Sequence, residues 1–149
     1  MANLVDILDA TAAIKCPADK FYNFFKYNMS DLVKIFPASF KGAQLLEGQE
    51  GTVGCVILWN YLLGVLPMSA KVITEAIDDA GKSITFAVLE GDVLQLYKSF
   101  KATLTVSDGL AKWSFAYEKA TLLSPPPELY LPFGIAICTM VDAYLLINN

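Results

Sequence analysis

Histidine is absent from the 149 residues of this chain, and its absence removes several kinds of chemistry. Histidine is the usual general base near neutral pH and the commonest protein ligand of zinc. Ser-His-Asp and Cys-His catalysis are therefore excluded. The chain also lacks a Gly-x-x-x-x-Gly-Lys-Ser/Thr phosphate loop and a Gly-x-Gly-x-x-Gly turn, so no nucleotide site is visible. We expect any reaction to need neither a metal ion nor a cofactor.

Charge is also scarce, because charged residues make up 17% of the sequence and the formal net charge is −4. The chain has no run of Lys or Arg that would neutralise phosphates, so we expect no nucleic-acid partner. Cys16, Cys55 and Cys138 are odd in number and widely spaced, which suits a reducing compartment and offers no disulfide framework. The first residues lack the basic and apolar regions of a secretory signal, so we expect a cytoplasmic location.

Apolar residues are plentiful instead. Hydrophobic residues make up 55% of the sequence, against roughly 45–50% in typical soluble domains. The length predicts a single domain over residues 1–149. Large exposed apolar patches are uncommon on monomers, so the surplus must line an internal cavity, face a partner or touch a membrane. Composition alone leaves all three open.

Alternating apolar and polar residues predict an antiparallel sheet. We expect strands over 4–14, 53–61, 66–75, 84–88, 97–106 and 113–117, with a bulge near Lys98. Short helices are expected after Pro17 and from Ser30, as its N-cap, to about Ile35, and a long helix from about 128 to 147, with Pro132 in its first turn. The predicted order is one strand, two short helices, six hairpin-joined strands and a long terminal helix, which is an α+β fold.

Several stretches resemble the major latex proteins of plants. The similarity is carried by Lys15 to Phe25, by Glu47 to Tyr61 and most specifically by Leu89 to Lys101. These proteins are a branch of the superfamily that includes the birch pollen allergen and START-like lipid-transfer domains. The resemblance implies a helix-grip fold, in which a seven-stranded curved antiparallel sheet wraps around the C-terminal helix and encloses an apolar cavity. Members bind small hydrophobic metabolites, and some catalyse cofactor-free cyclisation or isomerisation.

Inward-facing positions of the predicted strands and helices are the expected ligand-binding residues. They are Phe21, Phe24, Val56, Leu58, Met68, Ala70, Val72, Ile84, Phe86, Val88, Phe100, Trp113, Phe115, Phe133, Ile137, Met140 and Val141. The alternative is that the aromatic residues of this set fill a solid core and do not line a cavity. Which face the residues of 53–61 present does not follow from the pattern.

Tyr97, Tyr117 and Tyr144 are the expected catalytic residues, because without histidine a buried tyrosine hydroxyl is the available partner for a carbonyl or enol oxygen. An apolar wall would fold the substrate into a reactive conformer and exclude water. The alternative is that these hydroxyls bond only to the backbone or to water, as most buried tyrosines do.

Two segments depart from the family pattern. The hairpin at 61–68 is apolar where relatives carry a polar turn, and it predicts either a homodimer contact or a loop that covers the cavity mouth. The terminal stretch Leu129 to Ile147 is as long as a membrane span. It contains Asp142 and Pro132, and the sheet needs a helix to cover its apolar face, so we expect no stable membrane insertion.

The function predicted first is a cofactor-free cyclase or isomerase of a reactive terpenoid, similar to the iridoid-pathway members of the family that act on nepetalactol-type intermediates. An upstream pathway enzyme is then an expected partner. The second hypothesis is a non-catalytic carrier or sensor of a sterol, hormone or alkaloid. A third is a membrane-associated interaction protein that uses the apolar hairpin.

Overall fold

The computed structural model of the protein describes residues 5–148. Its elements in chain order are β1 (Val5–Ala13), α1 (Ala18–Tyr27), the 3-10 turn η1 (Met29–Asp31), α2 (Leu32–Ile35), β2 (Phe40–Glu47), β3 (Val56–Leu63), β4 (Leu66–Asp78), β5 (Ser83–Gly91), the 3-10 turn η2 (Asp92–Gln95), β6 (Tyr97–Ser107), β7 (Leu110–Lys119) and α3 (Tyr130–Ile147). Leu4, the first residue of the first predicted strand, lies outside the described residues.

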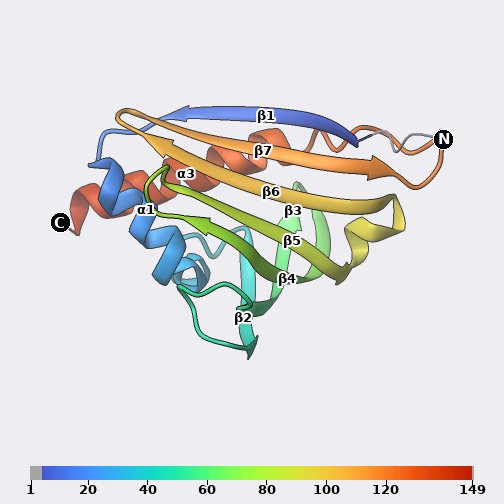
Figure 1. The fold of residues 1–149 in the computed structure, drawn as a ribbon, viewed down its shortest axis with the longest axis horizontal. Coiled ribbons are helices and arrows are strands. Elements are labelled where there is room, and N and C mark those ends of the chain that lie inside the picture. Colours follow the sequence, from blue (N-terminus) through green and yellow to red (C-terminus); the bar gives the residue numbers. More distant parts are fainter. Residues whose placement is uncertain (1–4, 149) are drawn as a thin grey trace.

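The strands form one curved antiparallel sheet in the order β1-β7-β6-β5-β4-β3-β2. The sheet has six pairs of neighbouring strands. Five of them join strands that are consecutive in the chain, and the sixth joins the first strand, β1, to the last, β7. The long helix α3 lies along one face of this sheet (Figure 1). The shorter helices α1 and α2 both contact α3, and they also contact β6 and β2, respectively. The predicted α+β helix-grip architecture is confirmed.

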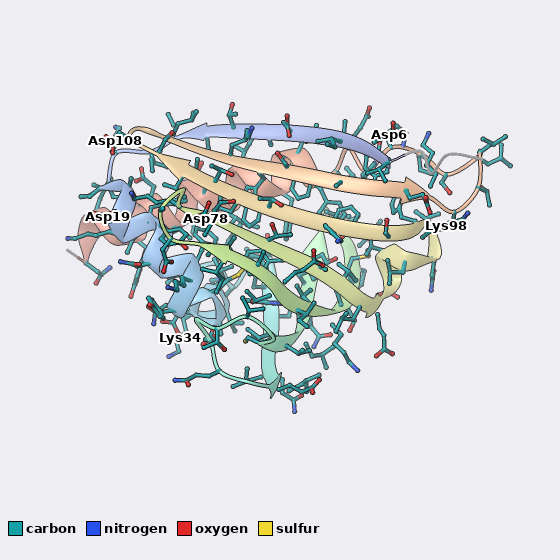
Figure 2. The ribbon with its side chains drawn as sticks, viewed as in Figure 1. Asp6, Asp19, Lys34, Asp78, Lys98 and Asp108 are labelled. Carbon is teal, nitrogen blue, oxygen red and sulfur yellow. The ribbon has the colours of Figure 1, made fainter. Side chains whose placement is uncertain are left out.

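The period-two pattern produces the sheet because one face of each strand meets the core. In β7, Trp113, Phe115 and Tyr117 are buried, whereas Ser114 and Ala116 between them are only half-buried. Aromatic residues suit such a pleated, half-buried surface. Figure 2 shows Asp6, Lys98 and Asp108 at the margins of the molecule, near strand ends. Among the described residues, Asp142 of α3 is the buried charged residue, and the interior between sheet and helix is otherwise occupied by apolar side chains.

The strands pair with register shifts between β2 and β3, between β4 and β5 and between β6 and β7. The pairing of β6 with β7 shifts between Tyr97 and Ser99, which confirms the predicted bulge near Lys98. At the end of β5, Gly91 has φ +147, and a Cβ atom there would lie 2.4 Å from the carbonyl oxygen of Ser69 in β4. Only glycine permits this close approach of the two backbones.

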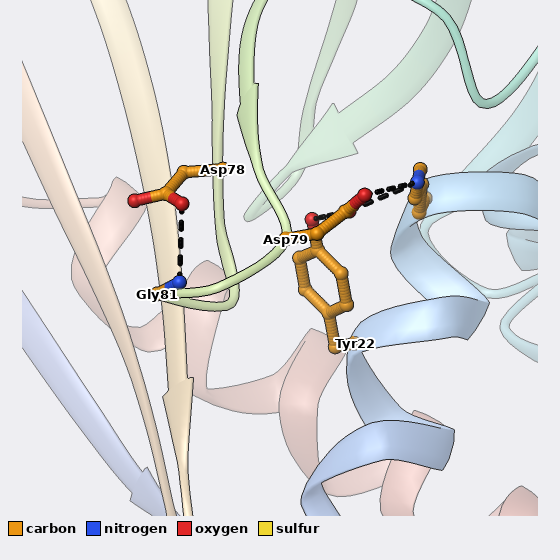
Figure 3. A network of polar contacts seen from close by, with 5 residues as sticks. Tyr22, Asp78, Asp79 and Gly81 are labelled. Carbon is orange, nitrogen blue, oxygen red and sulfur yellow. Dashed lines mark hydrogen bonds and ion pairs between the residues drawn. The ribbon is translucent and has the colours of Figure 1, made fainter.

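Helix α1 is attached to the turn between β4 and β5 by a polar cluster (Figure 3). The hydroxyl of Tyr22 donates to Asp79 Oδ1 at 2.7 Å, and Lys26 Nζ lies 2.9 Å from the same oxygen. Asp78 stabilises the turn itself, because its Oδ1 accepts the N–H of Gly81 at 3.1 Å. These contacts fix the helix against the end of the sheet.

Helix α3 is attached at its C-terminal half by Asp142. The Asp142 carboxylate is buried and accepts hydrogen bonds from the backbone N–H groups of Lys15 and Cys16, which follow β1. By length and composition α3 is the one helix of residues 5–148 that could cross a membrane. Its packing on the sheet and the buried carboxylate fit a helix of the protein core, as the sequence predicted.

Ser30 is not the N-cap of the second helix, so this prediction was wrong. Its backbone N–H and its hydroxyl instead donate to the carboxylate of Glu50 at 3.1 and 2.9 Å. Glu50 lies in the glycine-rich connection between β2 and β3, which brings its side chain to η1. This long-range contact has no signal in the local sequence of the helix.

Candidate functional site

An apolar cavity of about 110 Å³ lies between the concave face of the sheet and α3. Strands β2 to β7 form one wall, α3 forms the other, and Met29 of η1 closes one side. The lining residues are Met29, Phe40, Trp59, Tyr61, Ala70, Val72, Phe86, Val88, Phe100, Ala102, Trp113, Phe115, Tyr130, Phe133, Gly134 and Ile137. No residue in this lining carries a formal charge at neutral pH.

Aromatic rings in mutual contact make up much of the wall. Trp113 stacks on Phe115 with centroids 6.2 Å apart, and Phe115 in turn contacts Tyr130 at 5.7 Å. On the other side Phe133 of α3 lies 5.5 Å from Phe40. Such ring pairs add to the stability of the wall beyond area burial. The cavity thus has a fixed, largely hydrocarbon surface.

The polar groups at one end of the cavity are two tyrosine hydroxyls. The Tyr61 and Tyr130 oxygens lie 2.6 Å apart in a buried hydrogen bond. Burial raises the pKa of the Tyr61 hydroxyl, partly offset by its hydrogen bond with Tyr130. Burial also raises the pKa of Tyr130, and the neighbouring Tyr61 adds to the effect. Both hydroxyls therefore stay protonated at physiological pH.

A third polar group in the lining is the indole N–H of Trp113. Trp113 is 4% exposed, and its Nε1 has no hydrogen-bond partner of normal geometry among the described residues. Burial raises the pKa of the nearby Cys138 thiol to about 12, while the Trp113 N–H acts in the opposite direction. The thiol is therefore an electrostatic neighbour of the indole, but its sulfur does not meet hydrogen-bond geometry.

A second hollow of about 430 Å³ lies outside the cavity, and we call it the outer groove. It is lined by the β3–β4 hairpin, by η2 and by the segment before α3, with Leu66, Leu96 and Leu129 among its residues. Tyr130 is the residue that both linings share. Tyr130 therefore lies between the inner cavity and the outer groove.

Part of the predicted ligand-binding set lies on the cavity. The residues that line it are Ala70, Val72, Phe86, Val88, Phe100, Trp113, Phe115, Phe133 and Ile137. They come from the strands with clean alternation and from the buried face of α3. Met68, a further member of the set, lines the outer groove.

The other predicted positions lie away from the cavity lining. Phe21, Phe24, Ile84 and Val141 are buried in the core, where they pack behind the lining residues. In β3 the alternation places Trp59 and Tyr61 on the cavity instead of Val56 and Leu58. Met140 is 37% exposed, because the buried residues of α3 lie on its other side.

The three tyrosines predicted as catalysts do not bring their hydroxyls into the cavity. Tyr97 lines the outer groove, and its hydroxyl donates to the carbonyl of Pro125. Tyr117 is buried against Tyr97, with ring centroids 5.4 Å apart. Tyr144 is half-buried near the end of α3, beside Phe24. Their catalytic role stays a prediction, and their positions do not support it.

Sequence reasoning missed several lining residues. They are Met29, Phe40, Trp59, Tyr61, Ala102, Tyr130 and Gly134. One available signal was Asn60, which is exposed and marks the outer face of β3, so that Trp59 and Tyr61 on either side face inward. Tyr130 had no such signal, because its position depends on where α3 begins after the three prolines.

In the part of the chain that the structure describes, no group of three or more Cys, Asp or Glu side chains is placed to hold a metal ion. The three cysteines are free and buried. The site is thus an apolar cavity with one hydroxyl pair and the indole N–H groups of Trp59 and Trp113.

Residues 4–148 match the Pathogenesis-related protein Bet v 1 family. MLP-like protein 43 of Arabidopsis thaliana is 35% identical over 151 residues, which cover 97% of this chain and 96% of the relative. MLP-like protein 34 of the same plant is 34% identical over 95% of this chain, but the chain spans only 46% of its length. The chain belongs to the Bet v 1 family and, within it, to the major latex proteins.

Solved structures support the same assignment. Ginseng major latex-like protein 151 from Panax ginseng superposes with a TM-score of 0.91 at 34% identity, covering 95% of this chain and 97% of that one. A point mutant of norcoclaurine synthase from Thalictrum flavum, bound to a transition state analogue, has a TM-score of 0.79 at 15% identity, covering 99% and 98%. The second likeness concerns the fold alone.

Proposed function

We propose that this protein binds a compact hydrophobic plant metabolite in the inner cavity and catalyses its cofactor-free cyclisation or isomerisation. The proposed substrate class is a reactive terpenoid intermediate of the iridoid, nepetalactol-forming type. The observation that carries the proposal is the cavity itself, whose lining is apolar apart from two hydroxyls and the indole N–H groups. Such a surface suits a ligand that is mostly hydrocarbon.

A closed apolar wall supports catalysis on a substrate that is already activated. It can hold a flexible chain with its reacting carbons close together and keep water away from a reactive intermediate. Neither effect requires histidine, a metal ion or a nucleotide. The norcoclaurine synthase structures supply an analogy at the level of the fold, where an enzyme uses the same helix-grip architecture.

The size of the cavity favours a small substrate. Pockets for drug-sized ligands usually measure roughly 300–1,000 Å³, whereas this cavity measures about 110 Å³. A dry cavity of roughly 150 Å³ lined by Leu, Ile and Phe binds benzene. A compact terpenoid that the walls accommodate by small movements fits this scale better than a sterol does.

The test is incubation of the purified protein with reactive iridoid intermediates at substoichiometric protein. Product stereoisomers are followed by gas chromatography against buffer and boiled protein. We expect faster formation of one cyclic stereoisomer than in buffer. An unchanged rate and product ratio, together with saturable binding of the same compounds, would show that the protein is a carrier.

The carrier or sensor of hydrophobic ligands is the second candidate function. It is favoured by the placement of Tyr97, Tyr117 and Tyr144, none of which directs its hydroxyl into the cavity lining. A carrier binds its ligand stoichiometrically and protects it from water without changing product ratios. The same incubation separates the two functions.

We also propose that the tip of the β3–β4 hairpin forms a homodimer contact. Val65 is 90% and Leu66 52% exposed, so two adjacent apolar side chains are in contact with solvent at the tip of the hairpin. Light scattering of wild type should show a dimer, and Leu62→Asp or Leu66→Asp should convert it to a monomer. Equal masses for wild type and both variants would exclude this contact. We further propose that the protein is cytoplasmic and that an upstream enzyme supplies the reactive intermediate.

A further inference from the structure

The hydrogen-bonding capacity of Tyr61 and Tyr130 exceeds what their mutual contact uses. Each hydroxyl has one proton to donate and can accept hydrogen bonds. Their oxygens lie 2.6 Å apart, so one hydroxyl donates to the other. The proton of the second hydroxyl has no acceptor among the hydrogen bonds of residues 5–148. The buried pair therefore retains one unused donor.

The unused donor lies at a boundary between two hollows. Tyr130 is the first residue of α3 and contributes to the linings of both the inner cavity and the outer groove. Its ring contacts Phe100 at 4.8 Å and Phe115 at 5.7 Å, so the aromatic part belongs to the cavity wall. The hydroxyl is held by Tyr61 of β3. Both residues of the pair line the inner cavity, so a ligand held there lies beside them.

The remainder of the cavity offers an oxygen atom little. Away from the pair, the lining consists of aliphatic and aromatic side chains and of Gly134, and its remaining N–H donors are the indoles of Trp59 and Trp113. The indole N–H of Trp113 is separated from Tyr130 by the stacked ring of Phe115. An oxygen placed among the aliphatic residues would lose its hydrogen bonds to water without replacement, which is costly. The pair therefore orients any ligand that carries one oxygen.

We propose that the Tyr61–Tyr130 hydroxyl pair is the oxygen-binding site of the cavity, and that it selects compact hydrocarbons with a carbonyl, enol or hydroxyl oxygen at one end. This inference rests on the proposed function, because it assumes a ligand in the inner cavity. The oxygen lies toward the outer groove, and the hydrocarbon body lies toward Trp113 and Ile137. Both hydroxyls stay protonated, since burial raises the pKa of each.

The experiment compares two ligands of ten carbons that share one ring skeleton, the ketone menthone and the hydrocarbon limonene. Binding is read from intrinsic fluorescence, because Trp59 and Trp113 are the only tryptophans of the chain and both line the cavity. In the Tyr61→Phe/Tyr130→Phe variant we expect Kd for menthone to rise about tenfold, the value of roughly one hydrogen bond. Kd for limonene should change less than about twofold.

Tyr22→Phe is the matched control. It removes the hydroxyl of a buried tyrosine that bonds to Asp79 and lines neither the cavity nor the outer groove, so neither Kd should change. Should the double variant fail to fold by circular dichroism, Tyr61→Phe alone serves, with an expected rise of about threefold for menthone only. Equal effects on both ligands, or no effect on menthone, overturn the oxygen-binding site while the cavity function stands. Failure of wild type to bind either ligand overturns both.

Discussion

Asp142 is a buried carboxylate whose hydrogen bonds stabilise the folded state. The residue is 8% exposed, and its carboxylate accepts the N–H of Lys15 at 3.0 Å and that of Cys16 at 2.9 Å. Burial alone would raise the pKa of Asp142, but the hydrogen bonds from Cys16 and Lys15 outweigh it, and the pKa lies below its ordinary value. The ionised form is therefore the one that stabilises the folded state.

We predict that Asp142→Asn lowers the free energy of unfolding at pH 7 by about 1–3 kcal/mol, the cost of weakening charge-assisted hydrogen bonds to buried N–H groups. Urea denaturation of the two proteins measures this difference. Asp108→Asn, at an exposed turn, is the control and should change stability by less than about 0.5 kcal/mol.

The pH dependence of that difference has a definite sign. A carboxyl whose pKa is lowered by folding contributes its stability above the unfolded pKa of about 4, and loses it as pH falls through the folded pKa. Wild type should therefore lose stability below about pH 4, and its advantage over Asp142→Asn should shrink there. An advantage that is equal at pH 7 and pH 3 would show that the charge has no role.

The sequence did not predict which residues of β3 line the cavity, or where the hydroxyls of the three tyrosines point. The apolar run of β3 has no polar alternation until Asn60, so Val56 and Leu58 were as good a choice as the residues beside them. Trp59 and Tyr61 face the cavity instead. The alternation pattern predicts correctly that Tyr97 and Tyr117 are buried. It does not predict where their hydroxyls point, because that direction depends on tertiary contacts such as the hydrogen bond from Tyr97 to the carbonyl of Pro125.

At the scale of elements, the distance between α3 and β7 depends on Gly134. A Cβ atom at this position would lie 3.0 Å from Trp113 Cδ1 and 3.3 Å from Phe115 Cζ. The helix therefore lies so close to the aromatic wall that a methyl group at this position would fit only if the rings of Trp113 and Phe115 moved by a few tenths of an ångström. Because Gly134 lines the cavity, this approach also sets the width of the cavity.

We predict that Gly134→Ala weakens binding of menthone by about 1–3 kcal/mol, since an added methyl group crowds a packed site. Stability should change little, because alanine favours a helix by about 1 kcal/mol over glycine and offsets the crowding. Fluorescence titration measures the first effect and thermal unfolding the second. Ile135→Ala, on the exposed side of the same helix, should leave binding unchanged.

Helix α1 offers a second test at this scale. Tyr22 is 4% exposed, and its hydroxyl donates to Asp79 in the β4–β5 turn. Tyr22→Phe should lower the free energy of unfolding by about 0.5–1.5 kcal/mol, the net value of one hydrogen bond. Tyr27→Phe is the control, because Tyr27 is 49% exposed. Equal stability of Tyr22→Phe and wild type in urea would show that the ring packing alone holds the helix.

Most elements were predictable because their signals are local. Alternation located four of the strands that follow the helices, and apolar strand composition located β3. The terminal helix was found by its length, with Pro132 in its first turn. Strand β2 had no assigned range, although the predicted count included it. Most of its residues are exposed or half-buried, so the burial contrast that creates alternation is missing. Pairing with β3 makes it a strand.

At the scale of the whole molecule, ligand binding and folding are coupled. A ligand that binds only the folded state at 100 times its Kd adds about 2.7 kcal/mol to the free energy of unfolding. For a domain of this size, 1 kcal/mol raises Tm by roughly 2–4 °C. A true cavity ligand should therefore raise Tm by roughly 5–10 °C. This effect does not depend on fluorescence or on catalysis.

The final prediction concerns the size of the ligand that produces this stabilisation. The cavity measures about 110 Å³, and Tyr130 lies between it and the outer groove. Menthone should raise Tm, and a plant sterol at the same free concentration should leave it within about 1 °C, because drug-sized ligands need roughly 300–1,000 Å³. Differential scanning calorimetry measures both. Comparable stabilisation by the sterol would mean that the walls separate widely, and the protein would then be better described as a carrier of large lipids than as a catalyst that confines a small one.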